Sequence, residues 1–345
     1  MRLKSIKIKN FRNFENNFFS FSPFLTIVVG KNSVGKTNLL EAIYFGLYGQ
    51  GFREKKESQL IKMGENKNEV ELKFADKDSE YSFRVNLNLV DQKIKKNFFV
   101  NGTQKKFSFY KEEIKSAVIF TPQDIEIITR TPEERRRYFD TILSQFDWEY
   151  KNNLTNYKNA LKRRNKLLQT INNKNQLKNE IKFWDQFLEN LSQKIIKKRQ
   201  DYIHFLNQHN KIDSFIFEII YLKNEFSKIK AQEVFEKEIN LKQTFIGPQK
   251  DDFQISINQK NVHFFGSRSE QRLALFWLKF CEIRHQEETF KKKPLLLLDD
   301  IFSELDLDNK KLIFNLIYNY QTVMTTTDPF IADLPALPKT LITLK

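Results

Sequence analysis

The sequence has almost no cysteine and no long hydrophobic run. A single cysteine, Cys281, stands among 345 residues, which excludes an intrachain disulfide and favours a reducing cytoplasm. The densest apolar stretches, residues 24–29 and 295–298, are far shorter than the roughly 20 residues of a membrane helix. The first residues alternate and carry charge, so they lack the apolar segment of a secretion signal. We therefore expect a cytoplasmic protein without a membrane partner.

Acidic residues are outnumbered by basic ones. The chain holds 58 Lys and Arg against 43 Asp and Glu, a net charge of +15. Such an excess favours a polyanionic partner, and nucleic acid before a membrane surface. Lys, Asn, Ile and Phe are all abundant, which also indicates a general compositional bias. The placement of charge is therefore more informative than its total, and residues 151–211 hold 14 Lys and Arg against 4 Asp and Glu.

The clearest motif begins near residue 24. Residues 24–29 form a short β-branched run that predicts a buried parallel strand, and the octet at 30–37 fits the phosphate-loop pattern G-x-x-x-x-G-K-[ST] before a helical pattern. Its glycines let backbone N–H groups point at phosphate oxygens, and the helix adds its dipole. Lys36 is predicted to act catalytically on the β- and γ-phosphates, and Thr37 to bind Mg²⁺. The chain is therefore predicted to bind ATP or GTP. The nucleotide-binding residues are Gly30, Lys31, Asn32, Ser33, Val34, Gly35, Lys36 and Thr37.

A second set of motifs lies in the C-terminal third. Residues 294–300, Pro-Leu-Leu-Leu-Leu-Asp-Asp, read as a hydrophobic strand that ends in carboxylates, which is the Walker B pattern. Asp299 is placed to bind Mg²⁺ and Asp300 to activate the attacking water. Ser267 and Glu270 form a capping box before an apolar helix, and on its own this pattern predicts only a helix start.

Apolar residues keep helical spacing from residue 143 to residue 205. The rhythm runs on both sides of an Asn-rich turn at 172–175 and predicts an antiparallel helical hairpin. Two basic clusters on this hairpin would make one basic surface. Solvated helix faces are the plainer interpretation, but the concentration of charge favours contact with DNA. The predicted DNA-contacting residues are Lys162, Arg163, Arg164, Lys197, Lys198 and Arg199.

Strands account for much of the remaining sequence. Alternating patterns predict two strands ahead of residue 25 and an antiparallel β subdomain at 68–110. Further strands are expected at 117–120, 215–222 and 322–327. The fold class is therefore α/β with an inserted, mostly helical lobe. The predicted division has an ATPase lobe in two parts, residues 1–140 and 246–345, and a helical lobe at 141–245.

The order of these motifs resembles the RecF family of bacterial recombination and repair ATPases, which is related to SMC-type and ABC-type heads. The resemblance runs from Leu-Lys-Ser-Ile-Lys-Ile-Lys-Asn-Phe-Arg-Asn-Phe at residues 3–14 to the Thr-Thr-Thr-Asp at 325–328. Between them it rests on Phe-Thr-Pro-Gln-Asp at 120–124, Arg-Arg-Arg-Tyr-Phe-Asp at 135–140, Gly-Pro-Gln-Lys-Asp-Asp at 247–252 and Leu-Leu-Asp-Asp-Ile-Phe-Ser-Glu-Leu-Asp at 297–306. It implies the fold of an ABC/SMC-type P-loop NTPase head.

The resemblance also implies roles for residues outside the phosphate loop. Residues 267–272 correspond to the signature that meets the γ-phosphate bound to a second subunit, which adds Ser267, Ser269 and Glu270 to the nucleotide-binding set. Gln123 would act catalytically in the loop that links the nucleotide to the helical lobe. Ser303 and Asp306 would lie at the dimer interface.

The implied function is ATP-dependent DNA binding in recombinational repair and replication restart. It includes an ATP-driven homodimer, a weak DNA-stimulated ATPase, and RecO- and RecR-like partners that help to load recombinase at gaps. The DNA would be single-stranded, or linear or gapped double-stranded. A signature helix has nothing to bind on its own phosphate loop, so two chains sandwiching ATP are expected.

Some residues depart from the family pattern. Ser33 and Ser269 replace glycines, and Gln249-Lys250 replaces a His-Arg pair. A Cβ at residue 269 would crowd the γ-phosphate, which affects the ATPase rate more than ATP binding.

Two other classes stay open. An ABC transporter ATPase subunit shares the motifs but needs a membrane partner and a switch histidine, and the residues directly before Asp328 are threonines rather than such a histidine. A small-molecule P-loop kinase needs a lid and no signature.

Overall fold

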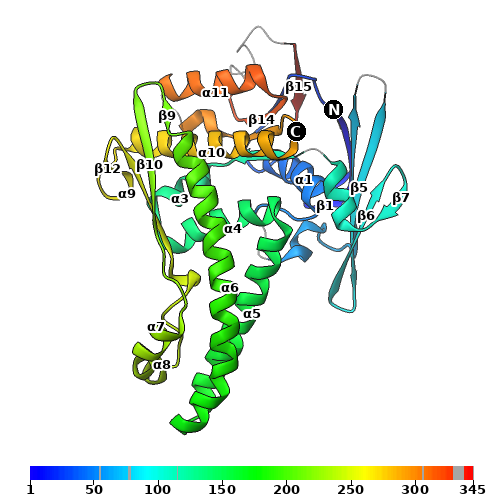
Figure 1. Cartoon of the computed structure of the whole chain (residues 1–345). Helices are drawn as coiled ribbons and strands as arrows, with labels where there is room; N and C mark the ends of the chain where they lie inside the picture. The colour runs from blue at the N-terminus through cyan, green and yellow to red at the C-terminus, as the bar shows by residue number, and fades with distance from the viewer. Residues whose placement is uncertain (54–55, 77–78, 115, 305–306, 329–337, 345) are drawn as a thin grey trace. The chain divides into compact units, whose positions relative to one another are not determined.

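The computed structural model describes residues 1–53, 56–76, 79–114, 116–304, 307–328 and 338–344, with only the backbone at 303–304 and 307–309 (Figure 1). The chain divides into two compact units. Unit 1 comprises residues 1–123 and 286–345, and unit 2 comprises residues 124–285. We predicted lobe borders at 140/141 and 245/246, and that three-part division stays a prediction.

A parallel five-stranded sheet carries the sequence motifs of unit 1. Its order is β15-β3-β14-β13-β8 and every neighbouring pair is parallel. The residues of β13 and β14 are all buried, as is nearly all of β3, which is why these strands read as continuous rather than alternating apolar runs. This confirms the predicted buried strands. The bounds are β3 (Leu25–Val29), β8 (Ala117–Phe120), β13 (Leu295–Asp299), β14 (Thr322–Thr326) and β15 (Lys339–Thr343).

A six-stranded antiparallel sheet forms the rest of the β structure of unit 1. Its order is β2-β1-β4-β5-β6-β7, and burial alternates along β1 and β4, so that one face is in the core. The predicted antiparallel subdomain is therefore confirmed. The bounds are β1 (Arg2–Phe11), β2 (Phe14–Ser20), β4 (Lys67–Ala75), β5 (Glu80–Val90), β6 (Lys93–Val100) and β7 (Thr103–Lys105).

Helix α1 (Lys36–Tyr48) contacts strands of both sheets of unit 1. Eleven of its thirteen residues are buried, as expected for a helix that packs on more than one side. Its first two residues, Lys36 and Thr37, are also the last two of the phosphate-loop octet, so the core fixes where that loop ends. The other helical segments of unit 1 are η1 (Glu57–Leu60), α2 (Phe107–Glu113), η4 (Ile301–Glu304) and α11 (Leu307–Asn319), and η2 (Pro122–Ile125) spans the border.

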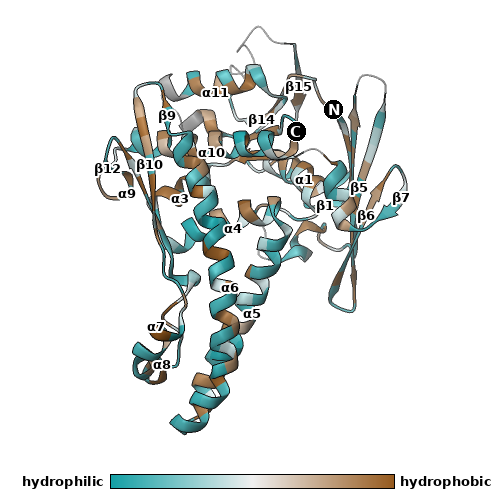
Figure 2. Cartoon of the chain, viewed as in Figure 1, coloured by the Kyte–Doolittle hydropathy of each residue, from teal (hydrophilic) through white to brown (hydrophobic). Residues whose placement is uncertain are grey.

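Unit 2 is built around a helical hairpin, α5 (Trp148–Thr170) and α6 (Lys174–Gln208). The bond between Arg164 and Asp185 links the two helices and confirms the predicted antiparallel pair. The hairpin is mostly hydrophilic, with interspersed hydrophobic residues (Figure 2). Asn173 caps α6 by accepting hydrogen bonds from two backbone N–H groups of its first turn.

An antiparallel sheet and several shorter helices complete unit 2. The strands are β9 (Lys211–Ile212), β10 (Phe215–Leu222), β11 (Asp252–Ile257) and β12 (Lys260–Asn261), in the order β12-β11-β10-β9. The helices are α3 (Glu126–Thr129), α4 (Pro132–Phe146), α7 (Lys228–Glu233), α8 (Phe235–Leu241), η3 (Pro248–Lys250), α9 (Val262–Phe265) and α10 (Arg268–Phe290), whose last residues belong to unit 1.

Two short helices of unit 2, α7 and α8, are separated by a break at Val234. Thr131 stands at the N-cap position of α4, but its side chain makes no capping hydrogen bond. Among the described residues, no helix is long and apolar enough to cross a membrane.

Candidate functional site

The phosphate loop joins β3 to α1, and its two glycines are required by their surroundings. Gly35 has a φ of 106°, and a Cβ there would lie 2.5 Å from the Nδ2 of Asn13. A Cβ on Gly30 would lie 2.8 Å from the backbone oxygen of Leu344. Neither position has room for a side chain. The loop is also tied down, because the Nδ2 of Asn13 donates to the Val34 carbonyl at 3.1 Å.

Ser33 occupies the position where the family pattern has a glycine. Its φ is 69°, in the left-handed region that glycine adopts without strain. A serine in this conformation costs roughly 1–2 kcal/mol. The loop therefore keeps the shape that the glycine pattern predicts, at the expense of local backbone strain.

The Lys36 ammonium lies across the phosphate loop. Its Nζ donates to the carbonyl oxygens of Gly30 at 2.7 Å and Lys31 at 2.9 Å, and the residue is buried. A buried cation beside backbone N–H groups at a helix N-terminus fits an anionic phosphate chain. The octet thus has the geometry of a phosphate-binding site.

The residues predicted to bind a metal come together, although they are 262 positions apart in sequence. The Thr37 hydroxyl donates to the Oδ1 of Asp299 at 2.9 Å, and the Thr325 hydroxyl donates to the same oxygen at 2.8 Å. Asp299 ends β13 and Thr37 is the second residue of α1, so the sheet brings them to one edge. A hydroxyl and a carboxylate in contact fit the oxygen preference of Mg²⁺.

Asp300 directly follows β13 and turns the chain. Its φ is 47°, and its N–H donates to the Thr325 hydroxyl at 3.0 Å and to the Thr325 carbonyl at 3.2 Å. These bonds fix the backbone of Asp300 against β14. The predicted base is therefore held next to the predicted metal ligand.

Sequence reasoning missed a buried acidic residue behind the loop. Glu41 lies on α1, its side chain is fully buried, and it accepts from Arg12 Nε at 2.8 Å and Arg53 Nη2 at 2.9 Å. Arg53 also donates to the side chain of Asn38 at 2.7 Å. A cavity of about 610 Å³ lies here, lined by Arg12, Asn13, Asn38, Arg53, Gln59, Ile61 and Met63. The spacing of Glu41 was the signal that could have identified it. Glu41 lies four residues after Thr37 and therefore on the same face of the helix.

Replacing Glu41 by glutamine is expected to lower the free energy of unfolding by about 1.5–3 kcal/mol at pH 7, since two guanidinium groups lose a charged acceptor. Burial alone would raise the pKa of Glu41, but the hydrogen bonds and charges of Arg53 and Arg12 outweigh it and lower that pKa below its ordinary 4.5. The stabilisation is therefore present above pH 4.5 and lost as the pH falls through the folded pKa.

Urea unfolding of the wild type and Glu41→Gln at several pH values measures this difference. The gap should be widest near neutrality and narrow as the medium is acidified below 4.5. A gap that stays constant down to acid pH would show that the carboxylate charge is not what stabilises this site.

Unit 2 carries the predicted signature at the start of α10. The capping box is confirmed: the Ser267 N–H donates to Glu270 Oε2 at 2.7 Å, and the Glu270 N–H donates to Ser267 Oγ at 3.2 Å. Lys260 pairs with Glu270 at 3.0 Å. These hydrogen bonds lower the pKa of Glu270, the Ser267 N–H contributing most. Ser267 and Ser269 are exposed, so both are accessible to a second molecule.

The remaining predicted interface and loop residues are less completely described. Gln123 is exposed in η2. The backbone of Ser303 lies in η4, and Asp306 falls outside the described residues. The roles of these three residues stay predictions.

Two residues predicted to contact DNA lie inside unit 2 instead. Arg164 is 0% exposed and Arg199 is 1% exposed, because the helical phase places each on the apolar side of its helix. Both must therefore be removed from the predicted basic surface. Lys198 is half-exposed and pairs with Asp147 at 2.6 Å. The exposed members of the set are Lys162, Arg163 and Lys197.

Arg164 is held by acidic and polar groups from three other segments. Its Nε donates to Asp185 at 2.7 Å and its Nη1 donates to the Thr244 hydroxyl at 2.8 Å. The same Nη1 lies 2.7 Å from an oxygen of Glu238, which is fully buried. This buried charge thus fastens α8 and residue 244 to the hairpin.

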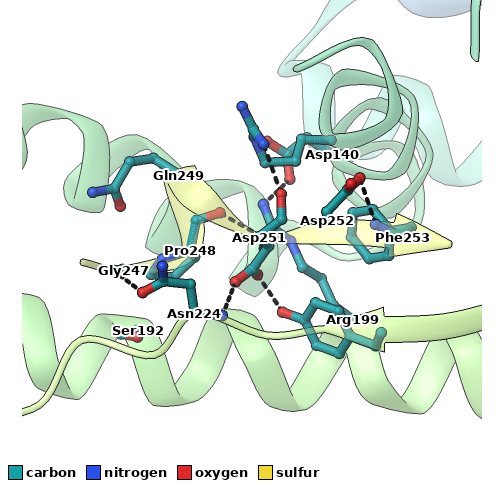
Figure 3. A network of polar contacts seen from close by, with 12 residues as sticks. Asp140, Ser192, Arg199, Asn224, Gly247, Pro248, Gln249, Asp251, Asp252 and Phe253 are labelled. Atoms are coloured by element: carbon teal, nitrogen blue, oxygen red, sulfur yellow. Dashed lines mark hydrogen bonds and ion pairs between the residues drawn. The ribbon is translucent and has the colours of Figure 1, made fainter. Parts of the chain in front are cut away.

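Arg199 binds the Gly-Pro-Gln-Lys-Asp-Asp segment at 247–252. Its Nη1 donates to Asp251 at 2.5 Å and its Nη2 donates to Asp140 at 2.7 Å (Figure 3). Its Nη1 also donates to the Pro248 carbonyl at 2.9 Å. Asp251 is fully buried and accepts further bonds from Tyr221 and from the Asn224 N–H. The segment is therefore the centre of a polar network that joins α4, α6 and β11.

The same segment contacts the Arg-Arg-Arg-Tyr-Phe-Asp segment at 135–140. Arg135 donates twice to Asp252, at 2.8 and 3.1 Å, and Arg136 donates to the Asp251 carbonyl at 2.6 Å. A two-pronged guanidinium–carboxylate pair fixes orientation as well as distance. Two of the segments that carry the family resemblance thus meet inside unit 2 and stabilise it.

A third buried cluster links α10 to the residue after Gln123. Lys279 lies 3.4 Å from Asp124 and 3.6 Å from Glu282, and the Tyr138 hydroxyl donates to Glu282 at 3.3 Å. Lys279 is 4% exposed. The helix that begins with the signature is therefore held to the segment that begins at Asp124, a coupling that sequence reasoning missed.

Comparisons with known proteins identify what the chain is similar to. The model of the family described as RecF/RecN/SMC N terminal domain matches residues 2–330. The DNA replication and repair protein RecF of Lachnoclostridium phytofermentans is 33% identical over 338 residues, which cover 95% of this chain and 93% of the relative. The protein of the same name from Lachnospira eligens is 34% identical over 340 residues, with the same coverage.

Solved structures give the same result. A structure of the recombination mediator protein RecF-ATPrS in the RecFOR pathway matches with a TM-score of 0.87 and 30% identity, over 99% of this chain and 95% of that one. The corresponding RecF-ATP structure matches with a TM-score of 0.82 and 31% identity, over 97% and 93%. An Smc head bound to the C-winged helix domain of ScpA, at 17% identity and a TM-score of 0.51 over 96% and 91%, shares the fold. The predicted ABC/SMC head fold is thereby confirmed.

Proposed function

The chain belongs to the RecF family of DNA replication and repair proteins, and from that premise we propose that it binds DNA in an ATP-dependent manner during recombinational repair. The observation that carries the proposal is the meeting of Thr37 with Asp299 beside the phosphate loop. This contact supports the assignment of one half of a nucleotide site to the chain. Two of the similar solved structures are of RecF-ATPrS and RecF-ATP.

In the proposed site, each residue has a distinct task. Backbone N–H groups of residues 30–37 and the Lys36 ammonium bind the phosphate chain of ATP. Thr37 and Asp299 hold Mg²⁺, which neutralises phosphate charge when bound. Asp300 accepts the proton of the water that attacks the γ-phosphate. The strained Ser33 and the Cβ of Ser269 are consistent with a slow ATPase.

The proposed nucleotide site is shared between two copies of the chain. Ser267 is exposed at the start of α10, a 23-residue helix whose N-terminal dipole favours an anion. We assign to it the γ-phosphate of ATP bound to a second copy. Nucleotide binding at Gln123 would affect α10 through the contact of Asp124 with Lys279, which are 3.4 Å apart. ATP would thus control dimerisation.

DNA and protein partners complete the proposal. Lys162, Arg163 and Lys197 are exposed on the hairpin and supply phosphate contacts. The two similar RecF structures belong to a recombination mediator of the RecFOR pathway, which supports RecO- and RecR-like partners and recombinase loading at gapped DNA.

Replacing Asp300 by asparagine tests both the ATPase and the DNA-binding parts of the proposal. Asparagine keeps the shape but cannot accept the proton, so ATP should bind normally and hydrolysis should fall at least about 100-fold. The dimer on DNA should then persist in ATP. Phosphate release measures turnover, and anisotropy of a labelled gapped duplex measures lifetime on DNA. Asp213→Asn, in the exposed β9–β10 turn, is the matched control and should behave as wild type.

Normal turnover in Asp300→Asn would remove Asp300 from the role of base. If the wild type binds ATP but its turnover and its affinity for DNA are independent of one another, the ATP-dependent part of the proposal fails. Phosphoryl transfer to a metabolite without any effect of DNA would instead indicate a kinase.

A further inference from the structure

Three aromatic residues lie together on α6 without belonging to its buried face. Phe183 is 66% exposed and Phe187 is 39% exposed, and Trp184 lies beside both. The rings of Phe183 and Phe187 are parallel to within 8°, with centroids 6.2 Å apart. Trp184 meets each of them edge to face, at 83° and 78°. We call Phe183, Trp184 and Phe187 the aromatic platform.

The core of unit 2 does not require this platform. The buried face of α6 here carries Leu177, Ile181 and Leu188, and Phe235 of α8 packs with the first two of these. A helix turns 100° per residue, so Phe183 and Phe187 point away from that face. Folding alone would be served by polar residues at these positions, and large exposed aromatic groups of this kind mark interaction sites.

Cationic side chains lie near the platform, and the acidic Glu180 and Glu189 also flank it on α6. The guanidinium of Arg163, on α5, lies 5.5 Å from the centre of the Trp184 ring. Lys182 precedes Phe183 and is exposed, and Lys194 and Lys197 are exposed further along α6. The surface thus combines ring faces with cations, whereas the cores of protein–protein interfaces are depleted of charge.

We propose that the aromatic platform binds single-stranded nucleic acid, with unpaired bases stacked on the rings and phosphates at Arg163 and the neighbouring lysines. Interleaved aromatic and basic side chains are the recurring solution for single strands, because every base has a face that can stack. A duplex keeps its bases stacked inside and offers the rings nothing. The inference rests on the proposed DNA-binding function and assigns the single-stranded portion of a gapped substrate to this part of the hairpin.

Tryptophan fluorescence tests the stacking directly. The chain has three tryptophans, of which Trp148 is 71% exposed and Trp277 is fully buried with its Nε1 bonded to the His209 carbonyl. In a Trp148→Phe background, Trp184 is therefore the tryptophan that a ligand can reach. Addition of an oligodeoxythymidine of about 16 nucleotides should quench the emission, since this matches the site size of single-strand binders. A blunt duplex of equal length should not quench it.

Affinity measurements test the contribution of each ring. Phe183→Ala and Phe187→Ala should each weaken oligodeoxythymidine binding about tenfold and duplex binding less than twofold. Phe183→Tyr should retain the wild-type affinity, because tyrosine keeps the ring. Phe109→Ala is the matched control, since Phe109 is 55% exposed on α2 of unit 1. Circular dichroism melts verify that every variant is folded.

The outcomes separate the platform from the proposed function. If both alanine variants keep the wild-type affinity for single strands and no quenching is seen, the platform proposal is wrong. DNA binding by the wild type would in that case leave the proposed function standing. An alanine variant that alters only self-association in sedimentation, with single-strand affinity intact, also overturns it and assigns the rings to a second copy. A wild-type protein that binds no nucleic acid overturns both.

Discussion

Replacing Arg199 by alanine is expected to lower the free energy of unfolding of unit 2 by about 3–5 kcal/mol, because it leaves buried carboxylates without their cation. Asp251 is fully buried and Arg199 is its cationic partner at 2.5 Å, while Asp140 loses a bond of 2.7 Å. A loss of this size is a large part of the stability of an ordinary domain. Thermal and urea unfolding followed by circular dichroism measure it.

Lys197→Ala provides the matched control for Arg199. Lys197 is exposed on the same helix, two positions away, so its removal should change the unfolding free energy by less than about 0.5 kcal/mol. In DNA binding we expect the exposed residue to matter instead. Lys197→Glu should flatten the salt dependence of the affinity for DNA. If Arg199→Ala and Lys197→Ala have the same unfolding free energy, the network at residues 247–252 does not stabilise unit 2.

Mixing two inactive variants is expected to restore ATPase activity if each site is shared. Lys36→Met should inactivate the site built on the phosphate loop of the same chain. Ser267→Arg should inactivate the site built on the phosphate loop of the partner chain. In a mixed dimer one site then carries both lesions and the other carries neither. Random pairing of equal amounts should restore up to about a quarter of wild-type sites.

A second mixture controls for this result. Lys36 and Asp300 belong to the same unit and act on ATP bound to the same chain, so Lys36→Met mixed with Asp300→Asn should restore nothing. Equal recovery in both mixtures, or none with Ser267→Arg after subunit exchange has been demonstrated by labelled chains, would contradict a shared site. A specific ATPase rate that is independent of protein concentration would also contradict it.

Local sequence patterns predicted the elements whose structure depends mainly on residues that are close together in sequence. The phosphate loop, the strand before it and the helix after it are contiguous, so the glycine spacing and apolar run contain most of the information. The contact of Thr37 with Asp299 is in keeping with the sequence analysis, which assigned both residues to Mg²⁺. The hairpin was predictable because its apolar rhythm is long.

The arginine clusters show where sequence patterns fall short. In 162–164 and 197–199 three adjacent cations look alike, and only helical phase separates Arg164 and Arg199 from their neighbours. That phase was readable, since Arg164 lies four residues before the buried Leu168. The sequence could not reveal which acidic residues neutralise the buried arginines, although a buried arginine needs such partners. The partner of Arg199, Asp251, is 52 positions away in sequence.

Gln321 draws together segments from the two ends of the chain. Its side chain accepts from the Leu3 N–H at 2.8 Å and donates to the carbonyls of Leu3 at 2.7 Å and Ser22 at 2.9 Å. The strand β3 likewise has both of its sheet neighbours, β14 and β15, beyond residue 321. During synthesis, the phosphate loop therefore emerges early but cannot be completed until almost the whole chain has been made.

Unit 2 is continuous in sequence and has no such delay. It spans residues 124–285, so on the ribosome it can fold while β3 still lacks its partners. Domains generally fold as units in the order in which they are completed, and sheets with distant partners form slowly. The middle of the polypeptide thus matures before its beginning, and the nascent chain acquires its helical hairpin before it can hold a nucleotide.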